Sequence, residues 1–259
     1  ALARDGVVPP GYLNLAEITA QMNNRAGNFP AICKVVDLTA TYGTPATVQG
    51  RHMYAVKISD NVDLDEDEPA SLIVSCHHAR EIGTPVVALD TIDRLLNGYG
   101  VDPNITALVN NNEIWIAPVW NPDGYNYVFT GDNLWRKNRR PNTGGSFGAD
   151  LNRNYPFGWS SSCAGSTSGS SETYKGPSAG SEPETQTMTA WSTDRNFAKV
   201  LDYHSYGRET LFGYLCLSHP FTTYFGQEAA AVSSSSGYGG APPPPPPPGG
   251  EEEAPPPPP

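Results

Sequence analysis

The chain has 259 residues, which is enough for one large domain or two small ones with a buried core. It carries 16 basic against 27 acidic residues, a formal net charge of −11, and no cluster of Lys and Arg, so nucleic acid is not expected as a partner. No stretch reaches the ~18 to 20 apolar residues of a membrane span, so no membrane partner is expected either. The sequence begins at Ala1 with neither Met nor a signal-peptide pattern, so we expect a soluble, processed, mature protein.

Hydrophobic spacing predicts helices and strands that alternate along the chain. In chain order they are a helix from Leu13 to Asn28, strands at 53–59 and 71–76, a helix that begins at Thr84 and Pro85, a short helix at 104–109, a strand at 113–120, a helix from Ser181 toward Arg195, and a strand at 198–203.

Two of these helices have recognisable starts. Thr84 is expected to be an N-cap with Pro85 at the first helical position, and Ser181 with Glu184 matches a capping box. The buried stripe of the helix after Thr84 is expected to comprise Val86, Leu89, Ile92, Leu95 and Leu96.

The runs SLIVSC (71–76) and AKVLDY (198–203) are apolar enough to be covered on both faces. Together with the alternating helices they predict an α/β fold, a three-layer sandwich with a mixed, largely parallel central sheet and helices on both faces. In such sheets binding sites form beyond the carboxyl ends of the strands.

The C-terminal segment differs in composition from the rest. Twelve of the 26 prolines lie in two runs, Pro242–Pro248 and Pro255–Pro259, and polyproline cannot supply a packed core. We therefore expect residues 1–230 to form the folded domain and residues 231–259 to be a Ser/Gly linker followed by a low-complexity Pro/Glu tail.

The four cysteines are Cys33, Cys76, Cys163 and Cys216, and they contain no CxxC pair, which excludes a Cys-rich zinc module. Cys76 lies in a strand-like run and is expected to be a buried free thiol. Cys163, in a Ser/Gly-rich loop, is the better candidate for a disulfide.

Two predicted strands each end in a histidine. The segment after 71–76 contains His78-Ala-Arg-Glu81, and the segment after 198–203 begins with His204. Two His and one Glu form a known ligand set for catalytic zinc that leaves a position open. Two alternatives stay open: His77 could replace His78 as the ligand, or His78 and Glu81 could simply cap the following helix.

Seven short motifs then follow one another in order: HxRE, NPDGY, WRKNR, DLNRNY, SETYKG, SEPET and HSY. In this order they resemble the zinc metallocarboxypeptidases of the carboxypeptidase A/B superfamily, over roughly Tyr12 to Phe225. The stretches KISDN…DEDEP (57–69) and WRKNRRPN (135–142) look most similar to the bacterial carboxypeptidase T branch.

The resemblance implies a zinc-dependent exopeptidase that hydrolyses the C-terminal bond of peptides through a zinc-activated water. Carboxypeptidase A itself holds zinc with this His₂Glu set, so the ligand logic is borrowed from the family. By similarity the ligands are His78, Glu81 and His204. Arg136 would stabilise the oxyanion, and losing one such donor costs about 10² to 10³ in rate.

The substrate residues also come from the resemblance. Asn152 and Arg153 would grip the terminal carboxylate, a task that suits the planar fork of Arg. Arg80, Ser205 and Tyr206 would line the upstream subsites. The implied partner is a peptide with a free C-terminus, and we expect a monomer that is secreted and extracellular after removal of a signal and propeptide.

The acidic run at 60–68 has two interpretations. Dense oxygen ligands on a loop suit Ca²⁺, and the carboxypeptidase T-like proteins carry structural calcium around this loop, so Asp65, Glu66 and Glu68 are candidate ligands. The alternative is a solvated acidic loop.

The similarity fades after about Phe225, and no residue of this chain matches the family's general-base glutamate, its mobile tyrosine or its specificity residues. Either the C-terminal quarter is truncated or unassigned, or the chain is a divergent relative that binds zinc and peptide without turnover. A hydrolase of small amides or cell-wall peptides on the same scaffold is a third alternative, which the NPDGY-to-SETY stretch disfavours.

Overall fold

The computed structural model describes residues 8–161 and 164–207. Its elements in chain order are α1 (Leu15–Asn28), β1 (Cys33–Asp37), α2 (Leu38–Tyr42), β2 (Tyr54–Ile58), β3 (Ala70–Ser75), α3 (Thr84–Gly98), α4 (Pro103–Asn110), β4 (Glu113–Ala117), α5 (Pro122–Thr130), the 3₁₀ turn η1 (Leu151–Arg153), α6 (Pro183–Arg195) and β5 (Lys199–Tyr203). The predicted linker and tail, as well as Cys163 and Cys216, lie outside the described residues.

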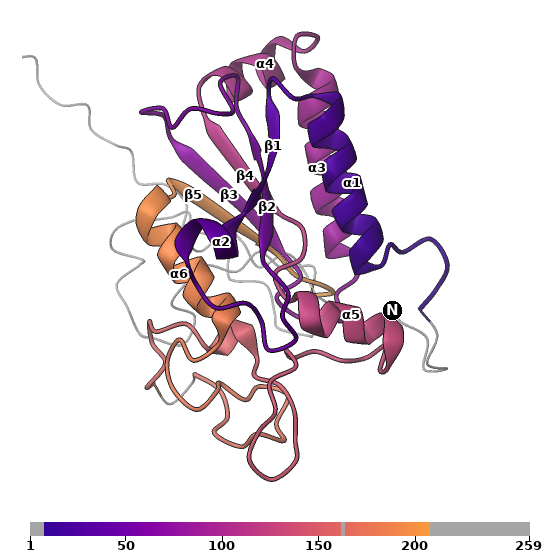
Figure 1. Cartoon of the computed structure of the whole chain (residues 1–259), viewed down its shortest axis with the longest axis vertical. Helices are drawn as coiled ribbons and strands as arrows, with labels where there is room; N and C mark the ends of the chain where they lie inside the picture. The colour runs from indigo at the N-terminus through magenta and orange to yellow at the C-terminus, as the bar shows by residue number, and fades with distance from the viewer. Residues whose placement is uncertain (1–7, 162–163, 208–259) are drawn as a thin grey trace, which may run out of the picture.

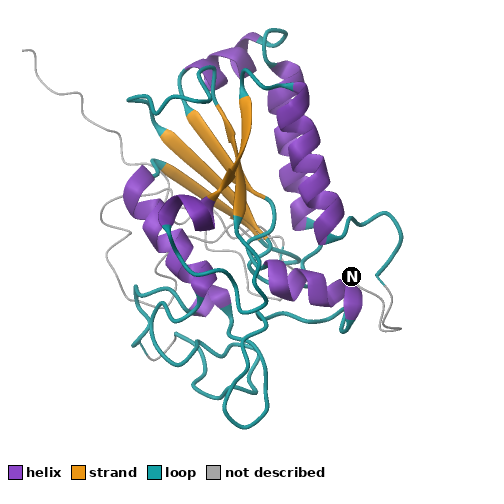
Figure 2. Ribbon diagram, in the orientation of Figure 1, coloured by secondary structure: helices purple, strands orange, loops and turns teal. Residues whose placement is uncertain are grey.

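A five-stranded mixed sheet, in the order β1-β2-β4-β3-β5, forms the middle layer (Figures 1 and 2). The pairs β1–β2 and β2–β4 are antiparallel, whereas β3 is parallel to both β4 and β5. The sequence therefore predicted the α/β class and the mixed sheet correctly. The half of the sheet formed by β4, β3 and β5 is the parallel half.

Helices cover both faces of this sheet because side chains alternate along each strand. On β4, Ile114 and Ile116 face the core under α1 and α3, while Trp115 and Ala117 face the core under α2 and α6. The long helices α1 and α3 lie side by side on one face, and α2 and α6 lie on the other (Figure 1). The three-layer arrangement follows from this alternation.

Local sequence explains most helix starts. The Asn14 side chain accepts a hydrogen bond from the Glu17 N–H while the Glu17 side chain accepts one from the Asn14 N–H, which is a capping box at α1. Asp102 caps α4, with Pro103 at its first position.

Among the described residues, no helix combines the length and the apolar character needed to cross a membrane.

Three details of the predicted helices were wrong. Thr84 is the first residue of α3 and not its N-cap, because its hydroxyl donates to the Glu81 carbonyl. The Ser181 hydroxyl donates to the neighbouring Glu182 side chain, so no capping box opens α6. Val86 is 43% exposed, and Ala88 lies in the buried stripe in its place.

The edge strand β5 is also more open than its apolar sequence suggested. Val200 and Leu201 are 61% and 44% exposed, and only Asp202 and Tyr203 are partly buried. Within the described residues β5 pairs on one side only, with β3.

Cys76 is a buried free thiol, as predicted, and Cys33 is a second one. Burial raises the pKa of the Cys76 thiol well above its usual range, and the pKa of the Cys33 thiol rises to about 11 for the same main reason. Both thiols are therefore protonated and unreactive at neutral pH.

The contrast between two side chains of α3 gives a direct test of the packing. Ile92 is fully buried, so Ile92→Ala should lower the free energy of unfolding by about 2 to 5 kcal/mol through lost contacts and a cavity. The matched control Val86→Ala, on the exposed face of the same helix, should change it by less than about 0.5 kcal/mol. Urea unfolding of both variants measures the difference, and equal losses would contradict the assignment of the two faces.

Candidate metal centre

The centre lies where the parallel strands β3 and β5 end. Ser75 is paired with Tyr203 at the last position of the ladder, so the residues that follow the two strands emerge side by side. Cys76, directly after β3, has a φ of +59°, a left-handed conformation that is rare for a residue with a side chain. Its N–H donates to the Thr84 hydroxyl, which fixes the turn that carries His77 and His78.

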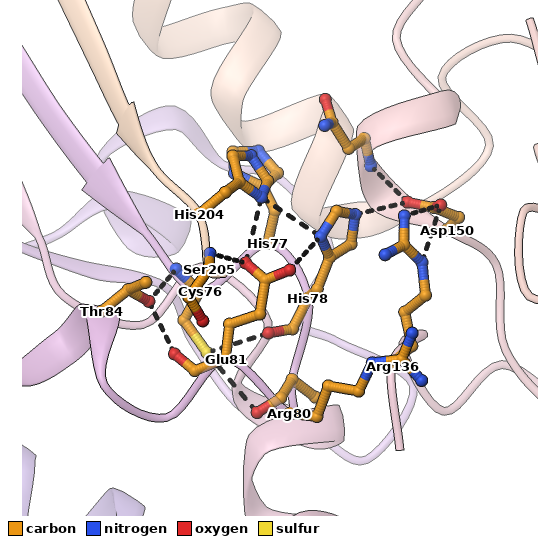
Figure 3. Close-up of polar contacts among 12 residues, drawn as sticks. Cys76, His77, His78, Arg80, Glu81, Thr84, Arg136, Asp150, His204 and Ser205 are labelled. Carbon is orange, nitrogen blue, oxygen red and sulfur yellow. Dashed lines mark hydrogen bonds and ion pairs between the residues drawn. The ribbon is translucent and has the colours of Figure 1, made fainter. Parts of the chain in front are cut away.

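Three donor side chains converge beyond these strand ends (Figure 3). His78 Nδ1 lies 2.9 Å from Glu81 Oε1, His204 Nδ1 lies 3.1 Å from Glu81 Oε2, and the two Nδ1 atoms lie 3.2 Å apart. His78 and Glu81 are buried, whereas the His204 side chain is 33% exposed. The sequence-predicted set is thus brought together from two separate strands.

The spacing of the three donors fits a zinc ion. Zinc at its usual 2.0–2.2 Å from nitrogen and oxygen ligands, with tetrahedral angles, places neighbouring ligands about 3.3 Å apart. The distances of 2.9 to 3.2 Å are close to this value. The facing Nδ1 atoms need a proton or a metal ion between them, because two bare imidazole lone pairs at this distance repel each other.

Burial and charge act in opposite directions on these groups. Burial raises the pKa of Glu81, but hydrogen bonds from His204 and His78 outweigh it and lower the pKa to about 2. Burial lowers the pKa of His204, but the carboxylates of Asp202 and Glu81 outweigh it and raise the pKa to about 10. The site strongly favours positive charge between its donors.

Asp150, which sequence analysis did not single out, connects the metal donors to the predicted oxyanion residue. Its Oδ1 lies 3.1 Å from His78 Nε2 and accepts from the Asn152 backbone N–H, while its Oδ2 accepts from Arg136 at 2.8 and 3.2 Å. The Asp150 side chain is fully buried, and His78 and Arg136 hold its pKa well below the usual range despite that burial. One carboxylate therefore fixes both a metal donor and a guanidinium.

A second carboxylate, Asp202, also escaped sequence analysis and lies behind His204. Asp202 Oδ2 is 2.8 Å from His204 Nε2 and 3.0 Å from His77 Nδ1. His77 Nε2 lies in turn 2.7 Å from the Tyr155 hydroxyl. His77, which the sequence left open as a substitute for His78 in the ligand set, therefore faces Asp202 and not Glu81. A spacing signal for Asp202 was present, since it lies in β5 two residues before His204.

The NPDGY motif stabilises the turn that carries His77 and His78. The Asn121 side chain caps α5 by accepting from the Gly124 N–H and donates to the His77 carbonyl. A Cβ on Gly124 would lie 2.5 Å from the Lys137 carbonyl and 2.9 Å from the Ala79 Cβ, so only glycine fits there. This motif is structural.

The basic run around Arg136 divides between site and scaffold. Among the cationic residues of this run, Arg136 is the one that contacts Asp150. Lys137 Nζ donates to the Gly169 carbonyl, and the Arg139 guanidinium lies 3.6 Å from the centre of the Tyr127 ring. These neighbours hold the long loop between α5 and α6 in place.

The remaining predicted site residues surround the centre at different distances from it. The Ser205 backbone N–H donates to Glu81 Oε2 at 3.1 Å, and Tyr206 is 92% exposed beside it. Arg153 Nη1 donates to the Asn152 carbonyl within η1, next to Asp150. Arg80 contacts the Leu134 carbonyl and, with Glu172, forms an exposed ion pair at 3.1 Å.

The acidic loop gathers a different set from the one predicted. Asp65 forms an ion pair with Arg195 at 2.6 Å and is not part of the acidic group that could hold an ion. Asp60 takes its place: carboxylate oxygens of Asp60, Glu66 and Glu68 lie within 4.8 Å of one another. Burial, together with the charges of Glu66 and Asp60, raises the pKa of Glu68.

With this geometry described, comparison with known proteins identifies the family. Residues 18–235 match the model of the zinc carboxypeptidase family, peptidase family M14. The chain belongs to this family of metallopeptidases. Its cofactor is accordingly zinc, and its His₂Glu cluster fits that metal.

Individual relatives agree with this assignment. The chain is 38% identical over 151 residues to a zinc carboxypeptidase of Saccharothrix mutabilis subsp. capreolus, covering 58% of this chain and 33% of that protein. It is 34% identical over 209 residues to carboxypeptidase A2 of Rattus norvegicus, covering 79% and 48%. The crystal structure of carboxypeptidase A from Helicoverpa armigera superposes with a TM-score of 0.67 at 32% identity, covering 76% of this chain and 46% of that one. The chain thus spans less than half the length of these relatives, and these matches do not distinguish the carboxypeptidase T branch.

The charge balance of the centre predicts a pH dependence for the metal-free chain. Because the folded-state pKa of His204 is about 10 against an ordinary 6.5, its stabilising contribution is full below about pH 6.5 and is lost as the pH rises through 10. Urea unfolding with a chelator present should therefore show a larger loss of stability between about pH 7 and pH 10.5 for the unchanged chain than for His204→Gln. Equal losses in the two proteins would contradict the stabilisation of protonated His204 by Asp202 and Glu81.

Proposed function

We propose that this chain carries the catalytic centre of a zinc exopeptidase that removes C-terminal residues from peptides. The observation that carries the proposal is the convergence of His78 Nδ1, Glu81 and His204 Nδ1 at 2.9 to 3.2 Å beside a guanidinium held by Asp150. When bound there, zinc supplies Lewis-acid polarisation of a carbonyl and lowers the pKa of a bound water. The family membership supports the same reaction.

Side chains around the metal site are proposed to stabilise the reacting oxygen and to bind the substrate. Arg136, fixed by two hydrogen bonds to buried Asp150, is the proposed donor to the oxygen that gains charge during peptide hydrolysis. Asn152 and Arg153, on the 3₁₀ turn that follows Asp150, are proposed to bind the terminal carboxylate of the substrate. Arg80, Ser205 and Tyr206 are proposed to contact the residues upstream of the cleaved bond.

Several finer features remain proposals from the sequence. They are membership of the carboxypeptidase T branch, a monomeric state, and secretion of a mature form. The similarity to the family fades after about Phe225, and no residue of this chain matches the family's general base. A zinc- and peptide-binding relative without turnover is therefore the second candidate function.

Peptide hydrolysis tests the proposal directly. A peptide with a free C-terminus should lose single C-terminal residues, a zinc chelator should abolish the release, and added zinc should restore it. The same peptide with an amidated C-terminus should resist cleavage because the carboxylate that Asn152 and Arg153 recognise is gone. His204→Gln should be inactive, whereas His52→Gln, whose side chain pairs with Asp37 and none of the three donors, should retain activity.

The possible outcomes separate the alternatives. Equal cleavage of the amidated peptide would show that the carboxylate assignment is wrong. Zinc and peptide binding without any release of amino acids would favour the non-catalytic relative.

We also propose a structural calcium ion at Asp60, Glu66 and Glu68. Each residue has one solvent-inaccessible carboxylate oxygen without a hydrogen-bond partner among the described residues, and hard oxygen donors suit Ca²⁺. The loop is already anchored, because the Lys57 ammonium contacts the Leu64 carbonyl and Asp65 pairs with Arg195.

Calcium binding should appear as thermal stabilisation. Added Ca²⁺ should raise the Tm of the zinc-loaded chain, and Glu68→Gln should remove that rise because it deletes one ligand charge. Asp67→Asn, an exposed neighbour outside the cluster, is the matched control and should keep the rise. A loop that is only solvated would give the same Tm with and without Ca²⁺ in all three proteins.

A further inference from the structure

The two histidines of the centre are held in the same way. His78 turns Nδ1 toward Glu81 and Nε2 toward Asp150, at 3.1 Å. His204 turns Nδ1 toward Glu81 and Nε2 toward Asp202, at 2.8 Å. Each imidazole thus has a carboxylate at the nitrogen that points away from the shared point, and Figure 3 shows Asp150 in this place at His78.

This arrangement selects one tautomer of each ring. A neutral imidazole can bind a metal through Nδ1 only when its proton is on Nε2. A carboxylate that accepts from Nε2–H holds that tautomer, fixes the ring plane and makes Nδ1 a better donor. Asp202 meets this requirement for His204 by distance.

Asp202 is itself held by two further residues. His77 Nδ1 lies 3.0 Å from the same Oδ2 that contacts His204, and the His77 and His204 rings stack with their centres 6.0 Å apart. The Tyr155 hydroxyl lies 2.7 Å from His77 Nε2. The contact between His77 Nδ1 and Asp202 lacks hydrogen-bond geometry, so His77 supports Asp202 by packing against it.

The burial of His77 restricts the movement of the side chains that contact it, Tyr155 and Asp202. His77 is 3% exposed, and its ring also lies against Trp120 at 6.4 Å between ring centres. The Asn121 side chain fixes the His77 backbone carbonyl as well. A carboxylate contacted by two imidazoles has little freedom to turn away from His204.

We propose that Asp202, supported by His77 and Tyr155, is a positioning residue that holds His204 in its metal-binding tautomer and orientation. The inference rests on the proposed zinc centre and adds to it a second carboxylate–histidine pair, independent of the one formed by Asp150 and His78. It also gives a role to His77, the histidine adjacent to the ligand.

A competing arrangement uses the same atoms differently. His77, Asp202 and His204 also offer three donor atoms within 4.8 Å of one another, so they could hold a second ion that shares the His204 ring. Such a ring would have to lose both of its protons. The 2.8 Å contact between His204 Nε2 and Asp202 Oδ2 is a hydrogen bond that uses one proton of the ring, which fits the single-ion arrangement better. The number of bound zinc ions separates the two arrangements.

The test measures zinc affinity of the full 259-residue chain by competition with a chelator of known affinity. Asp202→Asn should weaken zinc binding about 10- to 100-fold, the usual cost of losing such a partner. Asp90→Asn, which removes the same charge from the exposed face of α3, should leave the affinity unchanged. Cobalt substitution adds a spectroscopic measure, because a reoriented His204 should shift the visible d–d bands of Asp202→Asn but not of Asp90→Asn.

A double-variant cycle tests whether His77 acts through Asp202. His77→Gln alone should weaken zinc binding several-fold, and it should add nothing in the Asp202→Asn background. Additive losses would show that His77 does not act through Asp202. If Asp202→Asn does not fold, His77→Gln and Tyr155→Phe decide, and unchanged affinity and cobalt spectra in both would overturn the proposal.

Three further results separate this inference from the proposed function. An unchanged chain that binds one zinc, with Asp202→Asn as tight as Asp90→Asn, overturns the inference and leaves the proposed function standing. A second zinc equivalent that is lost in His77→Gln also overturns it, in favour of the second ion. An unchanged chain that binds no zinc overturns the proposed function itself.

Discussion

A fully buried negative charge, the carboxylate of Asp150, is the constraint on which the centre depends. An ionised carboxyl group in the interior is tolerated only when its oxygens are well paired. Asp150 satisfies this by accepting from Arg136 and the Asn152 backbone and by contacting His78 Nε2. The same pairing places a metal donor, a cationic donor and the turn carrying Arg153 around one point. Removing any one partner would leave charge uncompensated, so the parts of the site are coupled through Asp150.

The parallel half of the sheet explains why donors so distant in sequence meet. His78 and His204 are 126 residues apart, yet each follows a strand that ends at the same sheet edge. The antiparallel strands β1 and β2 contribute core and place no predicted donor at this edge. The strained turn at Cys76 and the Asn121 support then set the height of the histidine pair above the sheet. Function here depends on backbone geometry as much as on the identity of the ligands.

The sequence predicted the alternation of elements, the α/β class and the three converging donors, because each depends on local pattern or on the rule that sites lie at strand ends. It missed Asp150 because its contact with His78, 72 residues away, depends on packing, and it passed over Asp202 although Asp202 lies two residues before His204. The errors have local causes. Ala88 takes the buried position expected for Val86, and Asp65 pairs with Arg195 apart from the acidic cluster. Side-chain competition of this kind is invisible to spacing alone.

The central claim is that one zinc ion is held by Nδ1 of both histidines and by Glu81. X-ray anomalous scattering at the zinc edge from crystals of the zinc-loaded chain tests it most directly. The account predicts one strong peak about 2.0 to 2.2 Å from His78 Nδ1, His204 Nδ1 and a Glu81 oxygen, with each Nε2 still facing its aspartate. A peak coordinated by Nε2 of either ring, or one located away from Glu81, would contradict the account.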